Sequence, residues 1–189
     1  YGAQKVLHAS DERLNQGIIQ AYATVLENAL KDENADVLVL ANSSLGTPVA
    51  ARVAGKIGAS LATNVIDLPN TSSGFLVKRS KAFAWVELTN QKKVISIRKN
   101  AAEMKEVASP VQVTPYTAAF SDADFATKIT SAEKATGEIS LPEANIVVSG
   151  GRGMKGPEHW AILEELAKTL HAATGCSKPV SDMGWRPHH

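Results

Sequence analysis

A short strand, a glycine-rich turn and a helix follow one another in the C-terminal part of the sequence. Ile146–Val148 consists of β-branched residues typical of a buried strand, and the turn Ser149–Gly153 follows it. From Pro157 to Leu170 the apolar residues recur at helical spacing, and proline suits the first turn of a helix. This order predicts a strand–turn–helix unit, which aims backbone N–H groups and a helix N-terminus at an anion. The turn matches neither GxGxxG nor a Walker loop, so an ordinary turn with a solvated Arg152 explains it equally well.

The N-terminal part alternates between predicted strands and helices. Strands are expected at residues 4–8, 36–41 and 61–68, with helices at residues 10–30 and 47–58 between them. The run at 36–41 is continuously apolar, as in a strand that is covered on both faces. The alternation predicts a parallel, helix-covered sheet and hence an α/β fold.

The pattern changes after residue 70. Extended segments at residues 74–80, 82–88 and 93–98 predict an antiparallel meander. A strand at residues 111–116 has neighbouring prolines, which indicates a sheet edge. The stretch 118–141 is too polar to hold a core, so we expect a domain boundary near Gly137–Glu143. This divides the chain into domains 1–139 and 140–189.

Charge and composition exclude several classes of function. A net charge of +1 leaves no broad basic face for nucleic acid. No apolar run approaches the length of a membrane span, so no integral membrane protein is expected. The single cysteine, Cys176, excludes an internal disulfide and fits a reducing compartment. The first residues, Tyr1-Gly2-Ala3, lack an initiator methionine, and we expect the chain to be a piece of a longer protein.

Among the chemical sites, phosphate or cofactor binding remains the best supported. The five histidines lack metal-ligand spacing, so no metal site is expected, and no GxSxG motif or evident catalytic residue is present. Cys176 is better explained as a small filler residue than as a nucleophile. The strand ends Ser149–Gly153 and Gly175–Lys178 both carry small residues and a cation. Because ligands of open α/β sheets lie at the carboxyl ends of strands, these two loops predict one edge of a pocket.

The sequence resembles the α-subunits of electron transfer flavoproteins over nearly its whole length. The strongest match is Val148-Ser149-Gly150-Gly151-Arg152-Gly153. The other matching motifs are Tyr1-Gly2-Ala3, Lys5-Val6-Leu7-His8, Asn42-Ser43-Ser44 with Gly46, Ala51-Arg52-Val53-Ala54, and Gly175-Cys176-Ser177 with Pro179, Asp182, Gly184 and Trp185.

This resemblance implies a three-layer nucleotide-binding-like domain with a parallel sheet and an antiparallel meander, followed by the first part of a Rossmann-like FAD domain. It implies a heterodimer with a β-subunit that carries AMP. The complex is an electron carrier rather than an enzyme. It accepts electrons one at a time from acyl-CoA dehydrogenases of fatty acid β-oxidation and passes them to a quinone oxidoreductase. Its compartment is the bacterial cytoplasm or the mitochondrial matrix.

By resemblance, the FAD contacts fall on Arg152 and Ser177, with Gly151 and Gly153 in the same turn as Arg152. The next family position is usually arginine, close to the flavin ring, and here it is Lys178, which keeps the charge but loses the planar fork. The family's Gln-Val-Gly-Gln-Thr-Gly loop and Gly-Ile-Ser-Gly-Ala segment are absent. Two alternatives stay open: a nucleotide-binding module without flavin, and a structural module that only docks the β-subunit.

Overall fold

The computed structural model describes the chain except residues 1, 73, 80–82, 104, 108–109, 132–140, 142–143 and 188–189. The chain divides into two compact units, Tyr1–Thr130 and Ser131–His189. Our predicted boundary between residues 139 and 140 lies outside the described residues. The elements of the first unit are β1 (Val6–Ala9), η1 (Glu12–Gln16), α1 (Ile19–Asp32), β2 (Val37–Ala41), α2 (Gly46–Ile57), β3 (Ser60–Val65), β4 (Leu76–Arg79), β5 (Ala84–Glu87), β6 (Lys93–Ile97), β7 (Val113–Tyr116) and η2 (Asp122–Phe125).

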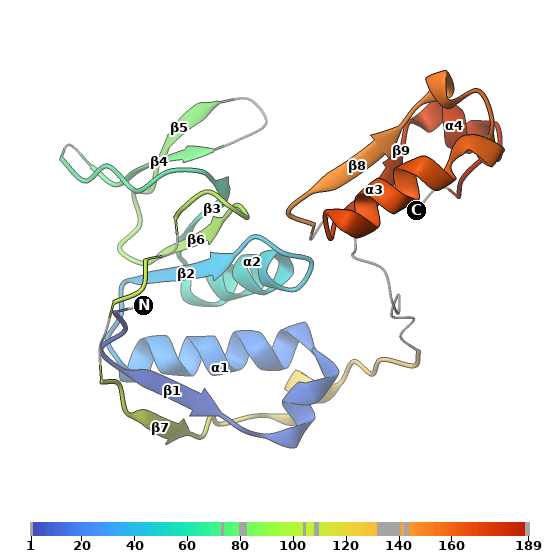
Figure 1. Ribbon diagram of the computed structural model, residues 1–189. Coiled ribbons are helices and arrows are strands. Elements are labelled where there is room, and N and C mark those ends of the chain that lie inside the picture. The colour runs from blue at the N-terminus through green and yellow to red at the C-terminus, as the bar shows by residue number, and fades with distance from the viewer. Residues whose placement is uncertain are drawn as a thin grey trace. The chain divides into compact units, whose positions relative to one another are not determined.

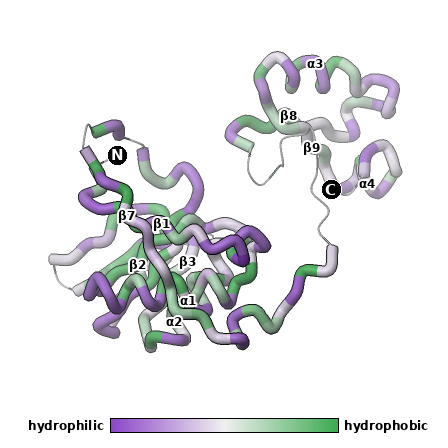
Figure 2. Tube along the Cα trace, turned by 90° about the horizontal axis from the view of Figure 1, so that it is seen from below, coloured by the Kyte–Doolittle hydropathy of each residue, from purple (hydrophilic) through white to green (hydrophobic). Residues whose placement is uncertain are grey.

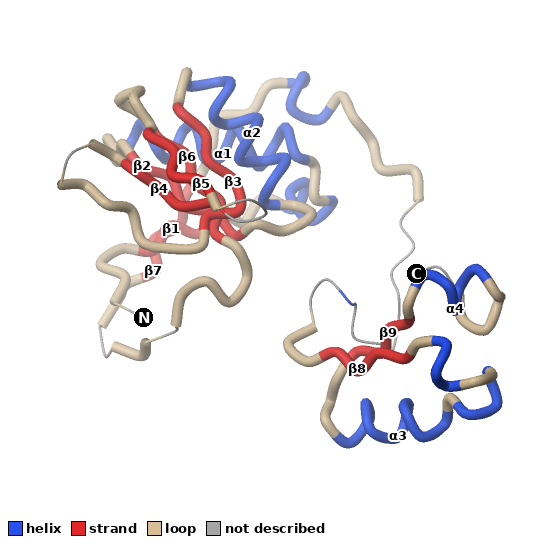
Figure 3. Tube along the Cα trace, turned by 90° about the horizontal axis from the view of Figure 1, so that it is seen from above, coloured by secondary structure: helices blue, strands red, loops and turns tan. Residues whose placement is uncertain are grey.

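The first unit is built on a five-stranded sheet with the strand order β2-β6-β3-β4-β5. The strands β2, β6 and β3 are parallel, while β4 is antiparallel to both β3 and β5. Helices α1 and α2 lie together on one side of this sheet (Figures 1 and 3). Leu38, Leu40 and Val94 of the sheet pack against them. The predicted α/β class with a parallel sheet is therefore confirmed.

The strand β6 corrects the predicted meander. Residues 93–98 were expected to form the last strand of the meander, but β6 lies between β2 and β3 and is parallel to both. Val94, Ile95 and Ser96 are each at most 2% exposed. A strand buried on both faces is typical of the centre of a parallel sheet, and this burial decides the position of β6. The antiparallel part consists of β3, β4 and β5.

Three further expectations for the first unit were wrong. Strand β1 does not join the large sheet but pairs in parallel with β7. The single helix predicted at residues 10–30 is interrupted at Gly17, whose left-handed φ of 70° ends η1, and Asp11 caps the start of η1. Strand β2 is covered on one face only, because Val37 and Val39 are 40% and 53% exposed.

The segment 118–127 adds to the core, contrary to the expectation from its polar composition. Phe120 and Phe125 pack against the buried N-terminal part of α1. The guanidinium of Arg13 lies over both rings, 5.1 and 4.4 Å from their centroids. Helix α1 therefore has two buried faces, one toward α2 and one toward this segment and β1 (Figure 1).

A buried network of hydrogen bonds connects the segment 118–127 to α1 and α2. The hydroxyl of Thr24 donates to Oδ1 of Asp124 at 2.6 Å and accepts from Nζ of Lys56 at 3.0 Å. The backbone N–H and the hydroxyl of Ser121 donate to Oδ2 of Asp124 at 2.7 and 2.9 Å. Asp124 is only 8% exposed, so these bonds replace the water that its carboxylate has lost.

We predict that Asp124→Ala lowers the free energy of unfolding of the first unit by about 2 to 3 kcal/mol, because the buried hydroxyl of Thr24 loses its acceptor. Urea denaturation at neutral pH measures the change. Asp122→Ala is the control, since Asp122 is exposed in the same turn and its loss should cost less than about 0.5 kcal/mol. Equal effects of the two substitutions would contradict a role for the buried network.

The stability that Asp124 provides should depend on pH. Burial raises the pKa of Asp124, but the hydrogen bonds from Thr24 and Ser121 outweigh burial and hold the pKa below its ordinary value of 3.8. The folded state therefore favours the ionised carboxylate, and the stability from this network is present above that ordinary value. We expect it to be lost as the pH falls through the lowered pKa, so the difference between wild type and Asp124→Ala should shrink in acid.

The second unit has the elements β8 (Val147–Gly150), η4 (Arg152–Met154), η5 (Pro157–His159), α3 (Ala161–Thr169), β9 (Ala173–Cys176) and α4 (Lys178–Asp182). β8 and β9 form a parallel pair, and Trp160, Leu163 and Val180 form the buried core of the unit. The predicted strand, turn, helix and second strand are confirmed, with a 3-10 turn replacing the start of the helix. In Figure 2 the helices of both units carry hydrophobic and hydrophilic segments, as helices with one buried face do.

Candidate functional site

The two predicted loops meet at the carboxyl ends of β8 and β9. Gly150 is the register partner of Cys176, and the backbone N–H of Ser177 donates to the carbonyl oxygen of Gly150 at 3.0 Å. A Cβ atom added to Gly151 would lie 3.7 Å from Oγ of Ser177. The structure thus brings the Ser-Gly-Gly-Arg-Gly turn and the Gly-Cys-Ser-Lys turn side by side at one edge of the pair of strands (Figure 1).

The glycines of the first turn have different roles. A Cβ atom on Gly150 would come within 2.6 Å of the indole of Trp160, so glycine is needed there for the strand to pack on its helix. Gly151 has extended backbone angles that any residue adopts, and a Cβ atom on Gly153 would meet no atom within 4 Å. Neither folding nor packing explains the missing side chains at Gly151 and Gly153. They leave open space beside the backbone, as a ligand that approaches the chain closely requires.

Two cations follow the strand ends. Arg152 begins η4 directly after Gly151, the residue that follows β8, and Lys178 begins α4 directly after Ser177. Both side chains are exposed, and neither forms an ion pair with a residue that the structure describes. Because the carboxyl ends of parallel strands lie at the same edge of a sheet, both cations follow strands that end at the edge where Gly151 and Gly153 lie. Unpaired cations beside open backbone favour an anionic ligand.

Lys155 is a further residue of this loop that the sequence patterns do not single out. It ends η4 with a left-handed φ of 66°, and its backbone N–H donates to the carbonyl oxygen of Arg152 at 3.0 Å. Its exposed side chain adds a third cation to the same loop. The only feature of the sequence that could have indicated Lys155 is its position two residues after the glycine turn. No general motif assigns a binding role to a lysine at this position.

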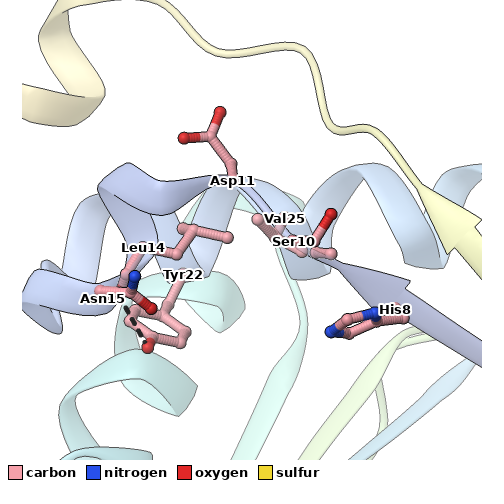
Figure 4. Close-up of a pocket in the computed structure, with 8 residues that line it drawn as sticks. His8, Ser10, Asp11, Leu14, Asn15, Tyr22 and Val25 are labelled. Carbon is pink, nitrogen blue, oxygen red and sulfur yellow. Dashed lines mark hydrogen bonds between the residues drawn. The ribbon is translucent and has the colours of Figure 1, made fainter.

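A separate cavity of about 360 Å³ lies at the carboxyl end of β1 (Figure 4). This cavity was not predicted from the sequence. His8 and Ser10 line one part of it, while Tyr22 donates its hydroxyl to the backbone of Leu14. The side-chain hydrogen bond from Arg13 holds the pKa of Asp11 at about 2, so an ionised carboxylate lines the cavity too. No cation lines it, which makes it a poorer place for a phosphate than the loops of the second unit.

Two further features were sought in the described part of the chain, a metal site and a membrane-spanning helix. No group of three histidine, cysteine, aspartate or glutamate side chains within it could hold a metal ion. None of the described helices is long and apolar enough to cross a membrane.

Comparisons with known proteins give matches over both units. The model of the "Electron transfer flavoprotein domain" family matches residues 1–123, and that of the "Electron transfer flavoprotein FAD-binding domain" matches residues 140–189. An electron transfer flavoprotein subunit alpha of Bacillus subtilis is 30% identical over 96% of this chain and 58% of its own length. That of Syntrophomonas wolfei is also 30% identical, over 100% of this chain and 61% of its own.

A more distant relative comes from an animal. A probable mitochondrial electron transfer flavoprotein subunit alpha of Caenorhabditis elegans is 26% identical over 99% of this chain and 57% of its own length. The chain therefore spans about three fifths of the length of the curated relatives it matches.

Proposed function

Since the chain belongs to the electron transfer flavoprotein family as an α-subunit, we propose that it carries electrons on FAD between dehydrogenases and a membrane acceptor. The observation that supports this most is the pair of strand-end loops, where open backbone at Gly151 and Gly153 lies beside Ser177 and exposed cations. The donors are acyl-CoA and related dehydrogenases, the acceptor is a quinone oxidoreductase, and a β-subunit with AMP completes the heterodimer.

The residues of the two loops have separate proposed roles in binding FAD. FAD, when bound, supplies the redox chemistry of its ring. Arg152 neutralises the anionic charge of the cofactor with its planar fork of donors. Ser177 donates a hydrogen bond to the cofactor, and Lys178 places a positive charge near the flavin. Gly151 and Gly153 let the cofactor approach the backbone.

Electron transfer itself tests the proposal. The protein with bound FAD is mixed with an acyl-CoA dehydrogenase that its substrate has reduced, and the visible absorbance of the flavin is followed. Loss of that absorbance on mixing supports the carrier function. Bound FAD that no reduced dehydrogenase can reduce would contradict it, and protein that binds the β-subunit without flavin would support a purely structural module.

Lys178 gives a prediction on the potential of the flavin. A positive charge beside the flavin stabilises its reduced, more negative form, so Lys178→Ala should lower the reduction potential. Lys178→Arg keeps the charge and should change the potential less, which makes it the matched control. A spectroelectrochemical titration measures both. If wild type and Lys178→Ala have the same reduction potential, the ammonium of Lys178 does not lie near the flavin.

A further inference from the structure

The hairpin of β4 and β5 exposes two aromatic rings around one lysine. Lys78 of β4 lies opposite Trp85 of β5. The ammonium of Lys78 lies 5.3 Å from the ring centroid of Phe83 and 6.0 Å from that of Trp85. Phe83 is 78% exposed and Trp85 is 56% exposed. We call these three residues the aromatic–lysine surface.

Folding of the first unit does not explain these rings. The other phenylalanine and tryptophan side chains in the described part of the chain are at least half-buried. A hairpin strand keeps its conformation with polar residues at solvent-facing positions, so Phe83 and Trp85 contribute little to the stability of the unit. Large exposed aromatic rings are instead typical of surfaces that bind another protein.

The charge of Lys78 also lacks a local partner. No carboxylate among the described residues forms an ion pair with it. The two rings hold the ammonium by cation–π attraction and fix its position on the surface. A partner that covers the rings removes water from this ammonium, and a carboxylate on the partner compensates for that loss. The surface thus fits an acidic partner with apolar groups around its carboxylate.

A second exposed apolar region of the first unit fits a partner less well. Val37 and Val39 of β2 are 40% and 53% exposed, but they present only aliphatic groups. Tryptophan and other aromatic residues dominate the binding energy of protein interfaces, whereas valine is under-represented there. We therefore favour the hairpin over β2.

We propose that the aromatic–lysine surface docks the second subunit of the carrier, and that this subunit places a carboxylate beside Lys78. The proposal rests on the proposed function, which supplies a heterodimer but leaves its contact surface open. Nucleic acid fits less well, although its bases stack on aromatic rings. Arg79, the other cation of β4, is not free to bind a phosphate, because its guanidinium is already bonded to Thr63.

The test measures the affinity of the purified β-subunit for wild type and for variants by sedimentation or thermophoresis. Trp85→Ala should weaken the complex by roughly 30-fold or more, the effect of a central interface residue. Lys78→Glu should weaken it as well, whereas Lys78→Arg should not. Leu68→Ala is the matched control, since Leu68 is also 78% exposed in the same unit and should leave the affinity unchanged. Circular dichroism and bound FAD should be the same in all variants.

The outcomes separate this inference from the proposed function. If wild type binds the β-subunit and FAD but Trp85→Ala binds as tightly as Leu68→Ala, the docking surface is refuted and the carrier function stands. If wild type binds neither the β-subunit nor FAD, the docking surface and the carrier function are both refuted. If Trp85→Ala loses affinity for an oligothymidine while its affinity for the β-subunit is unchanged, the surface binds nucleic acid and the proposal is overturned.

Discussion

Arg152→Ala should weaken the binding of FAD by roughly 10- to 100-fold, because a hydrogen bond between charged groups contributes about 1.5 to 3 kcal/mol. Arg152 is the first residue after the strand-end glycines, it is exposed, and it forms no ion pair with a described residue. Its removal therefore leaves the fold of the second unit unchanged and takes away a charge that the cofactor would use. Quenching of FAD fluorescence in a titration with the protein measures the dissociation constant.

Two further variants make this prediction specific. Arg152→Lys keeps the charge without the planar fork and should fall between wild type and alanine. Arg52→Ala removes another exposed arginine, from α2 of the first unit, and should leave the dissociation constant as it is. An Arg152→Ala protein that binds FAD as tightly as Arg52→Ala does would remove Arg152 from the cofactor site.

Trp160→Ala should lower the free energy of unfolding of the second unit by about 3 to 5 kcal/mol. The indole is 3% exposed and fills the space that a side chain at Gly150 would need. Arg186 also lies over its ring, 5.3 Å from the centroid, and forms an ion pair with Glu164 of α3. A unit of this size buries little apolar surface, so a loss of that magnitude approaches its whole stability.

Urea denaturation followed by tryptophan fluorescence measures this effect, since Trp185 packs against the same core and remains in the variant. Ile162→Ala is the control, because Ile162 is 71% exposed on the same helix and should cost less than about 1 kcal/mol. If both variants unfold at the same urea concentration, the packing around Trp160 does not hold the unit together. Trp160→Ala should also abolish FAD binding, since β8 and its turn rest on the indole.

The second unit could be predicted well from the sequence because its signals are local. The β-branched run before Ser149 indicates a strand, the glycines indicate a turn, and the apolar spacing after Pro157 indicates a helix. The position of β6 could not be predicted in this way. Three consecutive extended segments predict a meander, but pairing between distant strands depends on burial, which periodicity along one segment does not reveal.

The candidate site was predictable only in part, for a similar reason. The residue types of both loops are visible in the sequence, yet the approach of Gly151 to Ser177 depends on the register of β8 and β9. The same limit applies to two elements of the first unit. The apolar spacing at residues 10–30 predicts one helix, but the turn at Gly17 interrupts it. The apolar run at residues 36–41 predicts a strand covered on both faces, but Val39 is exposed. FAD as the cofactor was inferred from the family resemblance, since an anion-binding loop alone names no ligand.

The visible absorption spectrum of the protein, purified together with its second subunit, tests the proposed FAD site most directly. We expect flavin bands, FAD released on denaturation in an amount equal to that of the protein, and no such bands in the Trp160→Ala variant. A correctly folded heterodimer that shows no flavin bands, and takes up no FAD when it is added, would contradict the assignment of the β8 and β9 loops as the cofactor site.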